Sequence, residues 1–99
     1  MAVAVEFTVH GNGATLQNYL RVIEIMGARP EGSHPNPDCL FHWIAELDDG
    51  GYKVTDVWTN REAFEKFVET QIKPVSEQVG IPAGEANFID VGNYLTAHG

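Results

Sequence analysis

The sequence predicts one α+β domain spanning residues 1–99, with a four-stranded antiparallel sheet and helices on one face of that sheet. Two observations lead to this prediction. In four segments apolar residues alternate with polar ones, as in half-buried strands. In two others they recur every three or four positions, as in amphipathic helices. The order is strand 2–10, helix 16–26, strands 39–47 and 52–58, helix 61–73 and strand 86–95, or β-α-β-β-α-β.

The first strand and the first helix are separated by a clear break. Along residues 2–10 three valines and Phe7 fall on one face, because side chains in a strand alternate. Gly11-Asn12-Gly13 then interrupts the alternation, and it lacks the rest of a phosphate-binding pattern, so it predicts only a turn. Thr15 is expected to cap the helix, and Gly27 is expected to end it.

The two central strands are expected to form a hairpin, because Asp48-Asp49-Gly50-Gly51 between them is a strong turn signal. We predict that Glu46 lies opposite Lys53, since opposite charges on paired strands attract. This register places Trp43 opposite Asp56. The hairpin side facing the helices would then carry Phe41, Trp43, Ala45, Leu47, Tyr52, Val54, Asp56 and Trp58, with His42, Ile44 and Val57 on the other side.

Prolines and a helix cap mark the remaining boundaries. Residues 28–38 contain three prolines and are expected to form a long loop. Asn60 is a suitable N-cap for the second helix, whose buried stripe includes Phe64 and Phe67. Pro74 must stop or kink this helix, because proline has no N–H to donate and clashes with the preceding turn.

Composition and charge exclude several classes of protein. The net charge is −8 and the six Lys and Arg are scattered, so no basic patch is available to bind nucleic acid or an anionic membrane. The sequence has no run of about 18 apolar residues to span a bilayer and no basic start typical of a signal peptide. Cys39 is the only cysteine, which excludes an internal disulfide and favours a reducing cytoplasm.

This order of elements is that of the ferredoxin-like plait, in which both helices cover one face of the sheet. The other face is expected to be half apolar, because Ile44, Val57, Ile89 and Val91 would lie on it. Apolar surface of this kind indicates that another molecule covers it. A second copy of the chain is the simplest cover, so we predict a homodimer through the sheet face.

The junction between the third strand and the second helix resembles a known family. It reads Asp56-Val57-Trp58-Thr59-Asn60-Arg61-Glu62-Ala63-Phe64-Glu65-Lys66-Phe67, with an aromatic residue at the strand end, an Asn cap and an acidic-Ala-aromatic step. Together with Ile72-Lys73-Pro74 and the closing segment 88–95, it is similar to the antibiotic-biosynthesis-monooxygenase-like (ABM-like) proteins of the dimeric α+β barrel superfamily. The architecture covers nearly the whole chain, whereas the junction motif is short.

The resemblance implies a homodimer whose two sheets face each other, with a pocket in each subunit between sheet and helices. Some relatives are cofactor-free oxygenases acting on polyketide quinols, others degrade haem, and many have no known activity. Haem-degrading relatives use an Asn on the first strand, which residues 2–10 lack. Many oxygenase and haem-degrading relatives carry a His near the position of Phe67. Haem degradation is therefore disfavoured, and enzyme activity stays open.

Asp56 is the first candidate for chemistry, because a carboxylate among aromatic side chains costs free energy unless it has a partner or a role. It would accept a proton from the ligand, directly or through water, while Trp58 and Tyr52 position the ring. The alternative is a structural carboxylate satisfied by neighbouring N–H or O–H groups or by water, among aromatic residues that simply pack the core. The predicted catalytic residues are Asp56 and Trp58, and the predicted ligand pocket consists of Phe41, Trp43, Tyr52, Phe64 and Phe67.

The four histidines do not form a metal-binding motif. His10, His34, His42 and His98 are spread along the chain with no i, i+4 pair. The spacing of His34, Asp38 and Cys39 among prolines predicts a plain loop. His42 is expected on the dimer face as an interface or cross-strand hydrogen-bonding residue. We therefore expect no metal and no cofactor, although a metal-dependent enzyme stays an alternative.

Two functions from different classes remain open. In the first, an aromatic-lined pocket binds a hydrophobic or planar small molecule, and cofactor-independent monooxygenase-like chemistry is expected if the protein is an enzyme. In the second, the protein is a non-catalytic dimeric binding or structural module whose aromatic side chains leave no open pocket. A cleft of roughly several hundred Å³ that reaches Asp56 would favour the first function.

Overall fold

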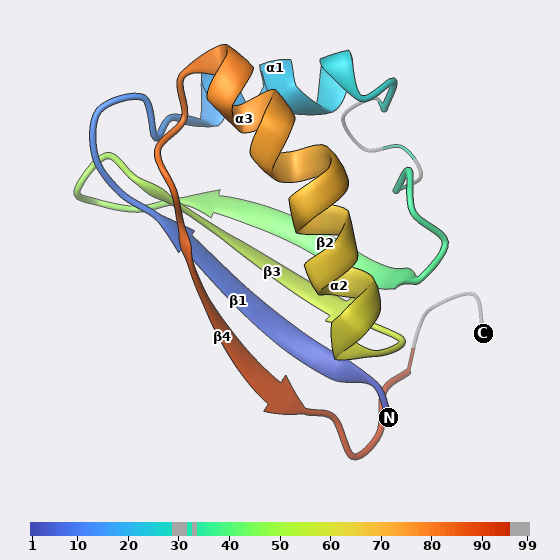
Figure 1. The fold of residues 1–99 in the computed structure, drawn as a ribbon. Coiled ribbons are helices and arrows are strands. Elements are labelled where there is room, and N and C mark those ends of the chain that lie inside the picture. Colours follow the sequence, from blue (N-terminus) through green and yellow to red (C-terminus); the bar gives the residue numbers. More distant parts are fainter. Residues whose placement is uncertain (29–31, 33, 96–99) are drawn as a thin grey trace.

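The structure is a computed structural model that describes residues 1–28, 32 and 34–95, so part of the loop 28–38 and His98 lie outside the described residues. It confirms the α+β class: four antiparallel strands form one open sheet in the order β2-β3-β1-β4, with helices against it (Figure 1). The elements are β1 (Val3–Val9), α1 (Leu16–Ile25), β2 (Cys39–Glu46), β3 (Tyr52–Trp58), α2 (Arg61–Phe67), a π-helical turn η1 (Val68–Ile72), α3 (Lys73–Val79) and β4 (Glu85–Asp90).

The predicted helix caps are confirmed. The Thr15 hydroxyl accepts a hydrogen bond from the Asn18 N–H at 3.1 Å, at the start of α1. The Asn60 side chain accepts one from the Ala63 N–H at 2.8 Å, at the start of α2. Gly27 follows α1 with φ of 83°, a left-handed conformation that glycine adopts without a steric penalty. Local chemistry therefore determines where these helices begin and end.

The predicted register of the β2–β3 hairpin is wrong by one residue. Glu46 pairs with Tyr52, and Lys53 lies opposite Ala45. Lys53 instead forms an ion pair with Glu6 of β1 at 2.6 Å. The loop between the two strands is consequently one residue longer than expected. The attraction between Glu46 and Lys53 is worth only a few tenths of a kcal/mol, and another partner for Lys53 was available.

This correction exchanges the two faces of β2, because a slip of one residue reverses the direction of every side chain. His42, rather than Trp43, lies opposite Asp56. Ile44 packs against the buried core rather than lying on the open face. Phe41 and Trp43, predicted to face the helices, lie on the open face of the sheet with exposed fractions of 60% and 47%.

The second helical region continues past Pro74 instead of stopping there. Between α2 and α3 the chain makes the π-helical turn η1, in which the Lys73 N–H donates to the Val68 carbonyl. Pro74 then falls in the first turn of α3, where a missing N–H is tolerated. The prediction correctly placed an irregularity of the helix near Pro74, but it did not include the π-helical turn that precedes this proline. In the described part of the chain, no helix has the length and hydropathy that crossing a membrane requires.

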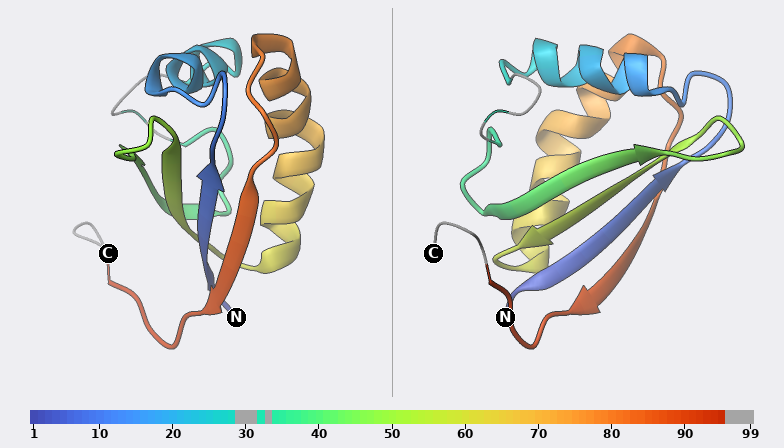
Figure 2. Two further views of the ribbon diagram at one scale, coloured as in Figure 1. Left: turned by 90° about the vertical axis from the view of Figure 1, so that its left-hand side faces the viewer. Right: turned by 180° about the vertical axis from the view of Figure 1, so that it is seen from behind.

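The helices cover one face of the sheet, as the two views in Figure 2 show. The core lies between the helices and this face. It has two parts that share the border residues Phe7 and Met26. One part joins α1 to the β1 and β3 ends near the hairpin loop, and the other lies under α2. Their buried residues are Val9, Ala14, Tyr19, Val22, Tyr52, Val54 and Ile81 in the first, and Val3, Val5, Trp58, Phe64 and Phe67 in the second.

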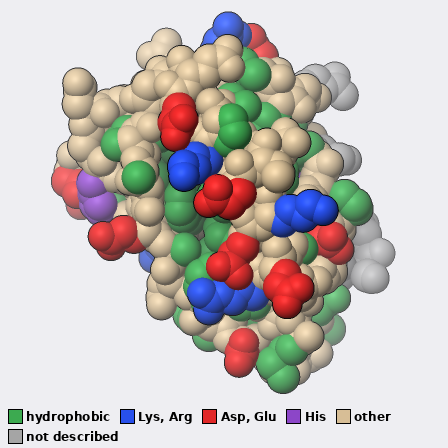
Figure 3. All heavy atoms as spheres, in the orientation of Figure 1, with side chains coloured by type: hydrophobic (Ala, Val, Ile, Leu, Met, Phe, Trp, Pro, Cys, Tyr) green, Lys and Arg blue, Asp and Glu red, His purple; other side chains and the backbone are tan. Residues whose placement is uncertain are grey.

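The opposite face of the sheet carries no helix (Figure 2, right). An apolar row crosses it, because Ala4 pairs with both Val57 and Ile89, and Val57 pairs with Phe41. Ile89 is 52% exposed. By contrast, acidic and basic side chains are interspersed on the face seen in Figure 3.

Candidate functional site

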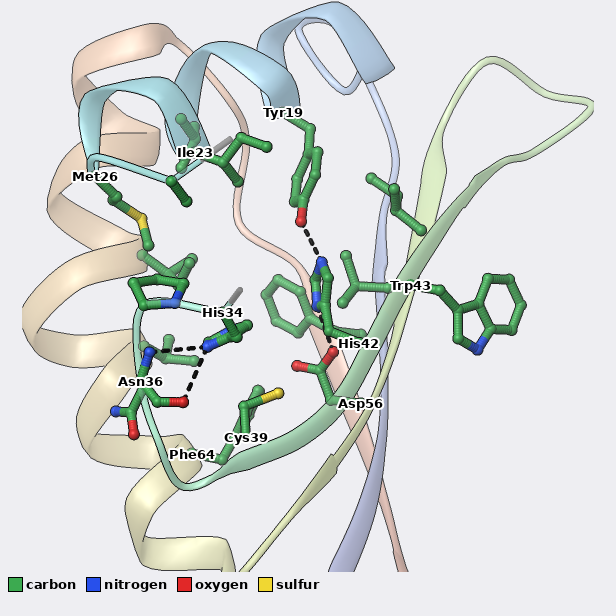
Figure 4. A pocket seen from close by; sticks show the side chains of 18 of the residues that line it. Tyr19, Ile23, Met26, His34, Asn36, Cys39, His42, Trp43, Asp56 and Phe64 are labelled. Atoms are coloured by element: carbon green, nitrogen blue, oxygen red, sulfur yellow. Dashed lines mark hydrogen bonds and ion pairs between the residues drawn. The ribbon is translucent and has the colours of Figure 1, made fainter. Parts of the chain in front are cut away.

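A cavity of about 880 Å³ lies between α1, the helix-facing side of the sheet and residues 34–37 (Figure 4). Apolar side chains from several elements form most of its wall, including Ile23 of α1, Val54 of β3 and Val68 of η1. Among the described residues that line it, no Lys or Arg is present. The described wall of the cavity is therefore largely apolar, and its volume lies in the range of ligand pockets.

One wall of the cavity carries a chain of hydrogen-bonded side chains from three elements. Asp56 of β3 lies directly opposite His42 of β2, and its Oδ1 is 2.5 Å from His42 Nδ1. Its Oδ2 accepts a hydrogen bond from Trp58 Nε1 at 2.9 Å. On the far side of the imidazole, the hydroxyl of Tyr19 from α1 contacts His42 Nε2 (Figure 4). The buried carboxylate is thus fully partnered.

For a neutral His42 ring, these partners indicate which ring nitrogen carries the proton. An ionised carboxylate only accepts hydrogen bonds, so His42 Nδ1 carries a proton that it donates to Asp56. Burial, and then the charge of Asp56, raise the pKa of Tyr19, so its phenol remains protonated. Tyr19 therefore donates its hydroxyl hydrogen to His42 Nε2, which is the unprotonated nitrogen. The result is a Tyr–His–Asp arrangement with the tyrosine at the cavity wall.

A second histidine lines the same cavity. The ring of His34 lies 5.4 Å from the ring of His42 and 5.4 Å from that of Trp58, measured between centroids. Its Nδ1 accepts a hydrogen bond from the Asn36 N–H at 3.0 Å. Burial, and then the neighbouring His42, lower the pKa of His34. Both effects favour the neutral ring.

Of the predicted site residues, Trp58 and Phe67 belong to the core and are not among the residues that line the cavity, whereas the other five line it. Asp56 and Trp58 are hydrogen-bonded to each other, Tyr52 lies beside Tyr19 with ring centroids 5.7 Å apart, and Phe64 packs on Trp58. Phe67 also packs on Trp58, in the core under α2. Phe41 and Trp43 border the cavity from β2, but Trp43 points away from it in Figure 4.

Sequence reasoning missed three residues of the arrangement: Tyr19, His34 and His42. The wrong register put His42 on the open face. The need of the buried Asp56 carboxylate for hydrogen-bond donors is a signal that would have favoured the register with His42 opposite it. Tyr19 was interpreted only as part of the apolar stripe of a helix, and nothing in the spacing of the 28–38 segment connects His34 to the sheet.

Two further observations bear on possible chemistry. Burial, and then the charge of Asp56, raise the pKa of the Cys39 thiol to about 12, so it is not an activated nucleophile. In the described ranges, no group of three or more His, Cys, Asp and Glu side chains is arranged to hold a metal ion.

The fold is that of the antibiotic biosynthesis monooxygenase (ABM) structures, although no family model and no curated protein matches the sequence. A Caulobacter crescentus protein proposed to be such a monooxygenase is similar over 93% of this chain and 91% of its own, at 18% identity and a TM-score of 0.67. Rv0793 from Mycobacterium tuberculosis matches over 97% and 100% of the two chains, at 14% identity and a TM-score of 0.62. SnoaB from Streptomyces nogalater, described as a cofactor-independent oxygenase, matches over 95% and 94%, at 19% identity and a TM-score of 0.56.

Proposed function

We propose that this protein binds an uncharged, planar, hydrophobic small molecule in the cavity and removes a proton from it. The observation that carries the proposal is the Tyr19–His42–Asp56 chain in the wall of an 880 Å³ apolar cavity. An oriented acid–base group beside a ligand-sized space is the usual organisation of a site for proton transfer.

The proton would move along the observed hydrogen bonds. The Tyr19 oxygen takes a proton from the ligand while its own proton passes to His42 Nε2. His42 then carries a positive charge, which the Asp56 carboxylate at 2.5 Å stabilises. Asp56 acts through His42 and is a positioning residue, held in place by the Trp58 N–H. This sequence differs from direct proton transfer to Asp56, because both Asp56 oxygens already have partners.

Cofactor-independent monooxygenation is the reaction we propose to follow the proton transfer. A ligand that has lost a proton is electron-rich and can react with molecular oxygen without a flavin or metal. For an activated CH₂ group, oxidation to C=O with release of one water accounts for both oxygen atoms. The likeness in fold to SnoaB, a cofactor-independent oxygenase, supports this choice.

The alternative is a non-catalytic dimeric module with no open pocket. That hypothesis requires aromatic side chains to fill the space between sheet and helices. Phe41 and Trp43, two of the five side chains expected to fill it, are largely exposed on the other face of the sheet. The cavity volume therefore supports the ligand-binding proposal.

We also propose that two copies of the chain associate through the open face of the sheet. The apolar row of Phe41, Val57, Ala4 and Ile89 crosses all four strands of this face, and Trp43 extends it. A contiguous apolar surface of this kind is uncommon on a monomer. Two-fold symmetry would bring the same row from each copy together.

Calorimetric titration with 2-naphthol, a neutral planar probe, tests the pocket. We expect measurable binding to the wild-type protein and at least about tenfold weaker binding to Ile23→Trp, because Ile23 points into the cavity and the larger ring would fill it (Figure 4). Glu62→Gln, on the exposed side of α2, is the matched control. Equal affinity of all three proteins, with unchanged circular dichroism, would place the binding site elsewhere.

A further inference from the structure

The two cavity histidines have opposite protonation patterns. His34 Nδ1 lies 3.0 Å from the Asn36 nitrogen and 3.3 Å from the Asn36 carbonyl oxygen. Because the backbone N–H can only donate, Nδ1 accepts from it, and a neutral His34 ring carries its proton on Nε2. His42 carries its proton on Nδ1, toward Asp56, and accepts at Nε2. One ring therefore offers an N–H donor, and the other completes a proton-accepting chain, with 5.4 Å between the ring centroids.

His34 is held in a fixed orientation. Its ring packs against Trp58 and against Phe67, with centroids 5.4 Å and 5.2 Å away. Two hydrogen bonds order the backbone next to it. The Asn36 N–H donates to His34 Nδ1, and the Asp38 N–H donates to the Asn36 side-chain oxygen at 2.9 Å. Among the described residues, His34 Nε2 makes no hydrogen bond, and the residue lines the cavity. This N–H is therefore available to an acceptor atom in the cavity.

A neutral imidazole is suited to stabilise an oxygen that gains negative charge. Burial and the adjacent His42 keep the pKa of His34 below its ordinary value, so the ring is a neutral donor near pH 7. Such a donor holds an enolate oxygen by a hydrogen bond that strengthens as charge develops. No Lys or Arg among the described lining residues could provide this stabilisation instead.

We infer that His34 is the hydrogen-bond donor to a carbonyl oxygen of the substrate, and that the site catalyses enolisation of an uncharged ketone or 1,3-dicarbonyl compound. The C–H next to the carbonyl loses its proton to the Tyr19 oxygen, whose own proton moves to His42. The C–H electron pair forms the C=C bond of the enolate, and the carbonyl electrons move to the oxygen held by His34. Return of the proton to carbon completes an exchange or an isomerisation that needs no oxygen.

This inference rests on the proposed function, because it requires the cavity to bind a small molecule. It adds to that function a class of substrate and a reaction that consumes no oxygen. The two can be separated, since binding of a probe and exchange of its protons are measured independently.

Hydrogen–deuterium exchange into 2-tetralone, an uncharged aryl ketone, is the test. In D₂O under nitrogen, we expect the wild-type protein to accelerate exchange at the carbon between ring and carbonyl by about 10²-fold or more over buffer, followed by proton NMR. His42→Gln should reduce the rate nearly to that of buffer. His34→Phe keeps a packing ring but removes the donor, and it should lower the rate by about 10²-fold with little change in 2-tetralone affinity.

Two further variants make the result specific. His34→Gln retains an N–H donor and should recover part of the rate lost in His34→Phe. His10→Gln changes a histidine that is bonded to Asp49 and does not line the cavity, and it should exchange like the wild type.

Each other outcome overturns a defined claim. Binding of 2-tetralone without accelerated exchange would refute the inference and leave the pocket in place. A His34→Phe variant as fast as the wild type would refute the donor role. Binding of 2-naphthol but not of 2-tetralone would refute the substrate class, and binding of neither would refute the proposed function itself.

Discussion

Asp56 and His42 lie opposite each other on neighbouring strands, and their side chains meet at 2.5 Å with exposed side-chain fractions of only 6% and 24%. A cross-strand pair of this kind connects the sheet register directly to the site. In the observed register, His42 is the residue of β2 that donates to the buried Asp56. The same contact therefore stabilises the fold and orients the imidazole.

Replacing Asp56 with Asn should lower the free energy of unfolding by about 1–3 kcal/mol. The amide offers a single acceptor oxygen where the carboxylate accepts from both His42 and Trp58, so one N–H is left without a partner. Urea unfolding followed by circular dichroism measures the loss. Asp90→Asn, at an exposed position of β4, is the control. An equal effect in both variants would contradict the importance of the network.

Trp58→Phe should be destabilising alone but less than additive with Asp56→Asn. Phenylalanine removes the N–H that Asp56 Oδ2 accepts, and it leaves a small void because Trp58 is completely buried. In the double variant, the single Asn oxygen can serve His42 alone. We expect a coupling free energy of about 0.5–2 kcal/mol from a double-mutant cycle in urea. Strict additivity would mean that the two side chains do not act on one another.

Stability should fall between about pH 10 and pH 12. Burial raises the pKa of Tyr52 to about 12, and burial raises the pKa of Tyr19 as well. Unfolded tyrosines ionise near pH 10, so above that pH the unfolded chain binds fewer protons than the folded one and unfolding becomes more favourable. The midpoints of urea unfolding at three alkaline pH values measure the loss of stability. Absorbance at 295 nm measures the ionisation of the tyrosines. Tyr52→Phe should show a shallower decline, and an identical slope would argue against buried phenols as the cause.

The Cys39 thiol should react slowly with Ellman's reagent. Its pKa of about 12, raised by burial and then by Asp56, leaves little thiolate at pH 8. We expect modification of the folded protein to be at least about tenfold slower than that of the same chain in guanidinium, and to accelerate as the pH rises. Comparable rates in both conditions would contradict the buried environment.

Light scattering should give about twice the 10.9 kDa mass of the chain. Phe41→Glu places a charge in the apolar row of the open sheet face and should shift the protein toward the monomer. Glu62→Gln also changes the charge by one unit, on the outside of α2, and should leave the mass unchanged. A wild-type monomer at micromolar concentration would refute association through this face.

Local signals in the sequence were sufficient to predict the element order. Thr15 and Asn60 make the predicted capping bonds, and β3 has the predicted bounds. Caps and alternation depend on neighbouring residues only, so a short window of sequence contains the information. The least accurate boundary is the end of β4, which was predicted at residue 95 and lies at Asp90 in the structure.

The site was less predictable because it depends on pairings between distant residues. Asp56 and Trp58 could be singled out from one strand, but the partner of Asp56 required the correct hairpin register. The observed register differs from the predicted one by one residue, and Lys53 forms its ion pair with Glu6 of β1 instead of with Glu46. Tyr19 is 23 residues from His42 along the chain, and only the packing of α1 on the sheet brings their side chains together.

The π-helical turn has a consequence for the shape of the cavity. It contains one residue more than the α-helical turn it replaces, and one residue corresponds to about 100° of rotation around a helix axis. Val68, the first residue of this turn, and Ser76 of α3 both line the cavity. The extra residue thus sets the rotation of α3 about the helix axis relative to α2. Deleting Gln71 would rotate α3 as a unit and move Ser76 off the cavity wall, so the length of this helix determines which of its side chains face the cavity.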